Sequence, residues 1–256
     1  SAIKDARKDL TPENEYYVGR SVATNLLAKA NYRYLEADFI ARGELGPLTT
    51  YVNQIGNVLA AAAMETPRNG DRPMPIGGWH FIIVDDATIG AFAAPGGTIL
   101  VNAGAIRAAK NEDQLAAVLA HEVAHVVRGH ALGSIKKSRW GNVAKEFLDS
   151  SVELDAAALG NLTEAFNGAM DDMIDSLTVK GYSRDTEFEA DKIGAEIMVA
   201  AGYDPDALVR YLQVLAGHSD DHGAGGFAST HPKPRDRVEK LEKHLTKLPD
   251  GRTAKV

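Results

Sequence analysis

The chain has 256 residues, of which 45% are hydrophobic and 25% charged, and these ordinary globular values exclude collagen-like, coiled-coil and disordered chains. It contains no cysteine, which excludes disulfides, thiolate metal sites and a cysteine nucleophile. The formal net charge of −7 disfavours a general nucleic-acid binder, so no nucleic-acid partner is expected.

The first third of the chain is predicted to be helical. Thr11, Pro12 and Glu13 form a helix start, because a hydroxyl caps the helix, proline fits its first position and an acid suits its first turn. This helix should run to about residue 34, and residues 66–78, rich in proline and glycine, should form a linker. Between them a helix should open at Pro47, with apolar residues at helical spacing: Leu48, Tyr51, Val52, Ile55, Val58, Leu59 and Ala62.

A short β region is expected next. Residues 79–84 are apolar, aromatic and β-branched, which favours a strand, and residues 89–94 and 98–101 are two further candidates. A Pro-Gly-Gly turn at residues 95–97 separates the last two. The three strands predict a small meander or hairpin.

A long helix is predicted from Asn111 to about Leu132. Asn111 and Gln114 form a capping box, and acids in the first turn suit the positive end of the helix dipole. The helix is apolar on most sides, so we expect it to be largely buried.

The rest of the chain is predicted to be helical. Residues 134–180 have an acidic, helical pattern interrupted by glycines at 141, 160 and 168, and are expected to form a lid beside the cleft or a purely structural layer. The remaining helices are expected at residues 183–202, 204–216 and 234–248, with a polar, glycine-rich loop at 218–229.

The main chemical signal is the HExxH motif of residues 121–125, inside the buried helix. His121 and His125 stand four residues apart, about 40° around a helix, so both imidazoles can reach one metal ion. Glu122 points in an adjacent direction, where it can contact a metal-bound water without becoming a ligand. Burying two histidines and a glutamate is costly unless they are paired or bind a metal, so one Zn2+ per chain is expected.

A catalytic zinc usually takes three protein ligands, so a third must come from elsewhere in the chain. The metzincin extension requires glycine and histidine where this chain has Arg128 and Ala131, which excludes that class. His130 lies about 140° round the helix from His125, so we expect it to support or cap the site rather than bind the metal.

A carboxylate from a later helix is the other source of a third ligand. Glu187 and Asp191 stand four residues apart, so one can bind the ion while the other orients a histidine ring. Without the HExxH motif, these acids would form an ordinary solvated helix face. The other histidines have weaker claims to a role in the site. His80 is expected in a strand, His218 and His222 in a loop, and His244 on a solvated helix.

Several segments together resemble a known family. They are residues 10–15, 19–20, 91–97, 119–125, 183–184, 187–191 and 230–232. The chain resembles zinc metallopeptidases of the HtpX and CAAX-prenyl-protease type, a gluzincin family, and within it the soluble periplasmic branch of BepA-like and LoiP-like proteins. The match spans roughly residues 10–245 and is far more specific than HExxH alone.

The resemblance implies roles around the metal. Glu187 would be the third zinc ligand, and Asp191 would support His121. Glu189, between them, would be structural. Arg237 matches a position that helps to build the site.

The resemblance also implies how substrate is bound. His231, which precedes a proline, would face the site and either contact the reacting carbonyl or cap the zinc in a latent form. Gly90 stands where family members often have asparagine, which removes a side-chain contact there. The segment after it resembles an edge strand that pairs with substrate backbone: Ala91, Phe92, Ala93 and Ala94.

The expected fold is therefore α+β and mainly helical, of the zincin-like metallopeptidase type, with a small β-sheet beside the HExxH helix. One domain, residues 1–256, would combine an N-terminal helical part (1–75) with a catalytic core (76–256). The expected function is a zinc-dependent metalloendopeptidase that hydrolyses unfolded or misassembled polypeptides through a zinc-activated water, with Glu122 as general base. The alternatives are a zinc-bearing chaperone or assembly factor with latent or regulated protease activity, and a zymogen closed by His231 or the 218–229 loop.

The compartment is a further expectation. The chain starts at Ser1 rather than Met, as after removal of a signal peptide, so a periplasmic or membrane-associated location is expected. Its longest apolar run, residues 58–64, is far shorter than the roughly 20 residues that span a bilayer. Candidate partners are polypeptide substrates and membrane or outer-membrane assembly proteins, and the oligomeric state stays open.

Overall fold

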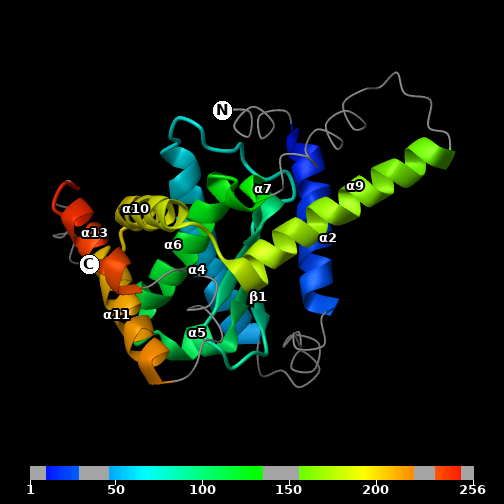
Figure 1. Ribbon diagram of the computed structural model, residues 1–256. Coiled ribbons are helices and arrows are strands. Elements are labelled where there is room, and N and C mark those ends of the chain that lie inside the picture. Colours follow the sequence, from blue (N-terminus) through cyan, green and yellow to red (C-terminus); the bar gives the residue numbers. More distant parts are fainter. Residues whose placement is uncertain (1–9, 29–45, 135–155, 222–233, 249–256) are drawn as a thin grey trace.

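The computed structural model describes residues 10–28, 46–134, 156–221 and 234–248. Within these ranges the chain is mainly helical with one three-stranded sheet, which confirms the expected fold class (Figure 1). Helix α2 (Pro12–Ala28) begins at the expected start, and α4 (Gly46–Glu65) begins one residue before Pro47. The expected end of the first helix, near residue 34, lies outside the described residues.

The apolar residues of α4 do not all face the core. Val52, Ile55 and Leu59 are buried as their spacing predicts, whereas Tyr51 is 38% exposed and Val58 is 49% exposed. The seven apolar positions cover more than one stripe of the helix, and only one stripe meets the protein interior.

Residues 66–78 form no regular element, as predicted, but they are bonded on both sides. Arg68 Nε donates to Glu196 Oε2 at 2.7 Å, and Arg72 Nε donates to Glu15 Oε2 of α2 at 2.8 Å. This segment, which we call the 66–78 loop, is therefore a fixed connection rather than a free linker.

The sheet corrects the expected meander. Strand β3 (Thr98–Asn102) lies in the middle, paired antiparallel with β2 (Ala91–Ala94) and parallel with β1 (His80–Val84). The expected hairpin is confirmed for β2 and β3, whose turn η1 (Pro95–Gly97) places Gly96 and Gly97 at φ 72° and 92°, values that glycine adopts without strain. The six residues that connect β1 to β2 are enough for the two strands to lie at opposite edges of the sheet, with β3 paired between them.

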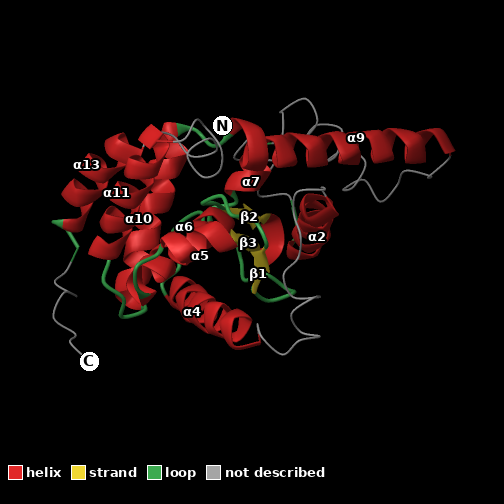
Figure 2. Cartoon of the chain, turned by 90° about the horizontal axis from the view of Figure 1, so that it is seen from below, coloured by secondary structure: helices red, strands yellow, loops and turns green. Residues whose placement is uncertain are grey.

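Helices cover both faces of the sheet (Figure 2). Because strand side chains alternate, one set packs with α4 and α6 and the other with α2 and α9. The first set comprises Phe81, Ile83, Ala91, Ala93, Ile99 and Val101, and the second comprises Val84, Phe92, Ala94 and Leu100.

The HExxH helix, α6 (Glu112–Val127), is buried along almost its whole length, as predicted. Asn111 Oδ1 accepts from the Gln114 N–H at 3.0 Å, and Gln114 Oε1 accepts from the Lys110 N–H at 2.9 Å. The expected end near Leu132 is wrong, because Gly129 turns the chain at φ 60° and a separate short helix, α7 (His130–Gly133), follows. A short helix, α5 (Ala103–Ala108), connects β3 to this region.

The remaining helices differ from the prediction in length or continuity. Gly160 and Gly168 do not interrupt α9 (Ala156–Asp175), which projects beyond α2 in both views and continues into a π-helical turn, η2 (Ser176–Lys180). His218 and the next three residues lie in α11 rather than in a loop, and residues 222–229 of that predicted loop lie outside the described residues. The other bounds are α10 (Arg184–Ala200), α11 (Asp206–Asp221) and α13 (Pro234–Leu245).

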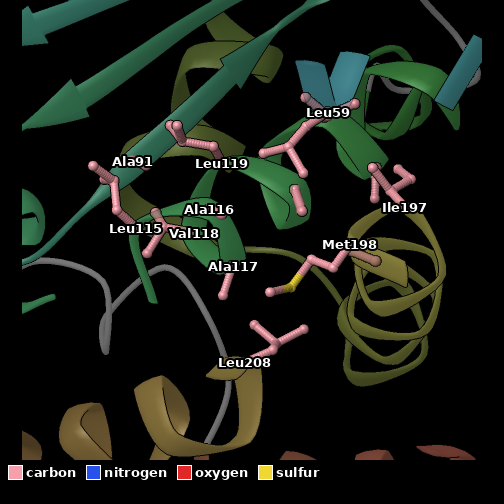
Figure 3. Packing of buried hydrophobic residues seen from close by; sticks show 14 of the residues in the cluster. Leu59, Ala91, Leu115, Ala116, Ala117, Val118, Leu119, Ile197, Met198 and Leu208 are labelled. Carbon is pink, nitrogen blue, oxygen red and sulfur yellow. The ribbon is translucent and has the colours of Figure 1, made fainter. Parts of the chain in front are cut away.

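The core is centred on α6, with α10 and α11 packed against it. Figure 3 shows the side chain of Met198 pointing from α10 toward Ala117 of α6 and Leu208 of α11. His244 of α13 is only 15% exposed in its side chain and lies 3.3 Å from Glu196, so the expectation that it is solvated is wrong. In the described ranges, no helix combines the length and apolarity needed to cross a membrane.

Candidate metal centre

Two histidines of α6 meet at their ring nitrogens. His121 and His125 are one helical turn apart, both almost fully buried, and their Nε2 atoms lie 3.1 Å from each other. The two rings are inclined by 72°. The pair therefore presents two nitrogen donors to one point inside the protein.

Helix α10 brings Glu187 to the same point. Its carboxylate oxygens lie 3.5 Å from each histidine Nε2, and the three ligand atoms all fall within 4.8 Å of one another. Ser183 caps α10 by accepting from the Thr186 N–H at 3.2 Å, which places Glu187 in the first turn. Two nitrogens and one carboxylate oxygen form the donor set typical of a catalytic zinc site.

Asp191 and Arg237 surround the back of His121. Asp191 Oδ1 lies 3.1 Å from His121 Nδ1, and Arg237 donates to both Asp191 oxygens at 2.8 and 2.6 Å. Arg237 also lies 3.0 Å from Glu187 Oε2. This fully buried arginine of α13 therefore joins the third candidate ligand to the carboxylate that supports the first.

The charges of this cluster set the protonation of its members. Burial favours the neutral form of Asp191, but the Arg237 guanidinium holds the pKa of that carboxyl below its usual value. Burial by itself lowers the pKa of His121, whereas hydrogen bonds with Asp191 and Glu187 raise that pKa to about 9. The carboxylates of Asp191 and Glu187 thus favour a positive charge at His121, whether a proton or a metal ion carries it.

His125 is supported differently. Its Nδ1 lies 2.9 Å from His130 Nδ1, and His130 Nε2 lies 3.3 Å from Glu189 Oε2. Bonds with His130 and Arg128 lower the pKa of Glu189 to about 2. His130 is therefore beside the centre without being part of the donor set, as its position in the sequence predicts.

Sequence reasoning missed Tyr182. Its ring stacks on His125 with centroids 4.5 Å apart and planes inclined by 22°. Tyr182 lies in the short segment between η2 and α10, after Gly181 at φ 68°. No motif marks this tyrosine, because its contact with His125 depends on how two distant segments meet.

Glu122 has the environment of a group that exchanges protons. It is 1% exposed, and its Oε1 has no hydrogen-bond partner among the described residues. Burial raises the pKa of Glu122 to about 7, an effect that nearby His121 and a hydrogen bond from the Ala93 N–H reduce. An unpaired buried carboxylate oxygen in the residue that follows the candidate ligand His121 matches a site for a metal and a water molecule.

Strand β2 lies beside this carboxylate with one edge unpaired within the described chain. Asn102 N–H donates to Gly90 O at 2.9 Å, so in this antiparallel register Phe92 and Ala94 also bond toward β3. The main-chain groups of Ala91 and Ala93 therefore point away from β3, which agrees with the bond between Ala93 and Glu122.

The structure thus brings together most of the residues that the sequence singled out. They are His121, Glu122, His125, Glu187, Asp191, Arg237 and the strand Ala91–Ala94. His231 lies outside the described residues, and its role stays a prediction.

Comparisons with known proteins extend over most of the chain. Residues 49–245 match the profile of Peptidase family M48. A beta-barrel assembly-enhancing protease of Yersinia pestis is 30% identical over 215 residues, which are 78% of this chain and 40% of that protein. The mitochondrial metalloendopeptidase OMA1 of Schizosaccharomyces pombe is 31% identical over 201 residues, 78% of this chain and 53% of that protein. The chain therefore spans about half the length of these curated relatives or less.

Proposed function

Because this chain belongs to peptidase family M48, we propose that it is a zinc-dependent metalloendopeptidase. The observation that carries the proposal is the meeting of three buried ligand atoms, from His121, His125 and Glu187, within 4.8 Å of one another. The unpaired buried oxygen of Glu122 lies in the residue next to the first ligand. Zinc held there would polarise a peptide carbonyl and acidify a water molecule.

Glu122 would act as the general base. Its pKa of about 7 lets the carboxylate take a proton from the attacking water near neutral pH and return it to the leaving amine. The hydrogen bond from Ala93 fixes the direction of the carboxylate, so Oε1 stays available for this exchange.

We further propose that substrate binds as an added strand beside β2. Ala91 and Ala93 direct their main-chain groups away from β3, and the Ala93 N–H reaches Glu122, so a chain laid along this edge would pass the candidate centre. Main-chain pairing requires an extended substrate and little side-chain specificity. Unfolded or misassembled polypeptides are the substrate class that meets this requirement.

The names of two relatives support a role in protein assembly. They are beta-barrel assembly-enhancing proteases of Yersinia pestis and Escherichia coli. By analogy, we propose membrane or outer-membrane assembly proteins as partners and a periplasmic or membrane-associated location. The same names favour the alternative function, an assembly factor whose protease activity is latent. His231 stays a candidate for the residue that contacts the reacting carbonyl or closes the centre.

The substitution Glu122→Gln tests the enzyme proposal. Replacing the base by an amide of the same shape should lower cleavage of an unfolded protein such as reduced casein at least ~100-fold, while zinc content stays near one equivalent. Glu239→Gln, at an exposed glutamate of α13, is the matched control and should cleave normally. Equal cleavage by both variants would overturn the role of Glu122. Tight holding of casein by the wild-type protein without cleavage would favour the assembly-factor alternative.

A further inference from the structure

We infer that His130 and Glu189 are positioning residues that hold His125 in the tautomer and orientation required for metal binding. The inference rests on the proposed function, which makes His125 a metal ligand. The two residues form a continuous line of bonds behind the His125 ring: 2.9 Å from His125 Nδ1 to His130 Nδ1, and 3.3 Å from His130 Nε2 to Glu189 Oε2.

The chemistry of a metal-binding imidazole fixes the direction of every hydrogen in this line. His125 can offer the Nε2 lone pair to a metal only if its proton is on Nδ1. That Nδ1–H must then donate to His130 Nδ1, so the proton of neutral His130 is on Nε2 and donates to Glu189. The carboxylate at the far end therefore selects the tautomer of both rings.

Glu189 is itself held in place. Its Oε1 accepts from Arg128 Nε at 2.9 Å and lies 2.6 Å from Arg128 Nη2. Arg128 Nη1 also donates to Asp71 Oδ1 at 3.1 Å, in the 66–78 loop. The line of bonds thus ends on a fixed ion pair rather than on a mobile side chain.

The turn after α6 makes this arrangement possible. On a continuous helix His130 would lie about 140° from His125, too far around for their rings to meet. Gly129, at φ 60°, ends the helix and starts α7, so His130 folds back beside the ring one turn earlier. A residue that replaces Gly129 would strain this backbone conformation.

The two candidate metal-binding histidines are supported in different ways. His121 Nδ1 meets the carboxylate of Asp191 directly at 3.1 Å, whereas the line of bonds from His125 Nδ1 reaches the carboxylate of Glu189 through a second imidazole. The Asp191 side chain is 1% exposed, and that of Glu189 is 42% exposed. The residues that support His125 therefore end at the partly exposed Glu189. A substitution of Glu189 changes this support without changing the hydrophobic core.

Zinc affinity, measured by competition with a chromophoric chelator, tests the inference. His130→Leu removes the acceptor and should weaken zinc binding roughly 10–100-fold, as for other residues that orient a metal ligand. His130→Asn places an amide oxygen near the position of Nδ1 and should retain affinity closer to wild type. Glu189→Gln should weaken binding in the same direction by a smaller factor. Cobalt-substituted His130→Leu protein should also show a changed visible absorption spectrum.

Glu196→Gln is the matched control, because Glu196 is on the same helix and pairs with Arg68 and His244 rather than with His130. It should bind zinc like the wild type. Equal affinities for wild type, His130→Leu and Glu189→Gln would overturn the inference, as would equal losses in His130→Leu and His130→Asn. If the wild-type protein bound no zinc, the proposed function itself would fail. Cooperative unfolding of each metal-free variant shows that a loss of zinc is not a loss of fold.

Discussion

The buried centre carries an excess of negative side chains. Glu122, Glu187 and Asp191 are each at most 1% exposed, and Arg237 bonds to two of them. A divalent cation at the two histidines would balance the remaining charge. Arg237 and a bound metal would therefore neutralise the same cluster of carboxylates. Loss of Arg237 should change metal binding, and loss of the metal should leave more of the negative charge to Arg237.

Removing Arg237 should destabilise the metal-free protein strongly. Arg237→Met leaves two buried carboxylates without their cation, and breaking a buried pair in this way costs about 3–5 kcal/mol of unfolding free energy. Added zinc should restore part of the loss, because it supplies positive charge beside Glu187. Urea unfolding with and without zinc measures both effects.

Arg210→Met is the control for that experiment. Arg210 pairs with Asp204 at 2.7 Å, but both side chains are 42% exposed. An exposed pair contributes about 1 kcal/mol or less, so this variant should unfold almost like the wild type. Similar losses in the two arginine variants would contradict the account of the buried cluster.

At the level of elements, the close approach of α10 to α6 decides the geometry of the centre. Gly194 faces the main chain of α6, and a Cβ there would lie 3.2 Å from His121 N and 3.3 Å from Ala120 C. A side chain at this position would push apart the two helices that carry the candidate ligands. The glycine is thus a packing residue seven positions after Glu187.

Gly194→Ala should weaken zinc binding and lower stability. The added methyl group meets backbone, which cannot move aside alone, and overpacking of this kind costs roughly 1–3 kcal/mol. The helix-propensity gain of about 1 kcal/mol offsets only part of it. Gly217→Ala on α11 is the control, since no atom of the described residues lies within 4 Å of its Cβ position. That variant should be as stable as the wild type or more so, and a stabilised Gly194→Ala would contradict the packing argument.

Across the whole molecule, the centre joins parts of the chain that are far apart in sequence. The candidate ligands come from α6 and α10, and Arg237 comes from α13. The core cluster around α6 extends from α4 to α13, so the predicted boundary near residue 75 does not separate two cores. That boundary falls in the 66–78 loop, whose arginines bond to α2 and α10. The single-domain organisation stays a prediction, now with this physical support.

Metal binding should therefore stabilise the fold as a unit. At a free zinc concentration 100-fold above the dissociation constant, binding adds about 2.7 kcal/mol, which raises the melting temperature by roughly 5–10 °C for a chain of this size. EDTA should reverse the shift, as followed by circular dichroism. His121→Ala should abolish it and His80→Ala, at an exposed strand residue, should retain it. A zinc-dependent shift that survives in His121→Ala would place the metal elsewhere.

The sequence by itself determined the local elements and the chemistry-bearing residues. Helix starts at Pro12, Asn111 and Ser183 are set by caps and first-turn residues, and these signals act within a few positions. The HExxH spacing placed two histidines on one helix face by helical geometry alone. The spacing of Glu187 and Asp191 predicts that one of them is the third ligand, and the family resemblance implies that it is Glu187.

Only the tertiary structure decided how these elements meet. The position of β3 between β1 and β2 depends on main-chain pairing across the chain, which periodicity does not encode. The end of α6 at Gly129 brings His130 to His125, and the junction before α10 brings Tyr182 onto the same ring. These contacts depend on packing between distant segments, whereas caps and helix faces depend on neighbours in sequence. The candidate donor atoms were therefore readable from the sequence, as were Asp191 and Arg237 through the family resemblance, whereas the contacts that bring His130 and Tyr182 to the His125 ring were not.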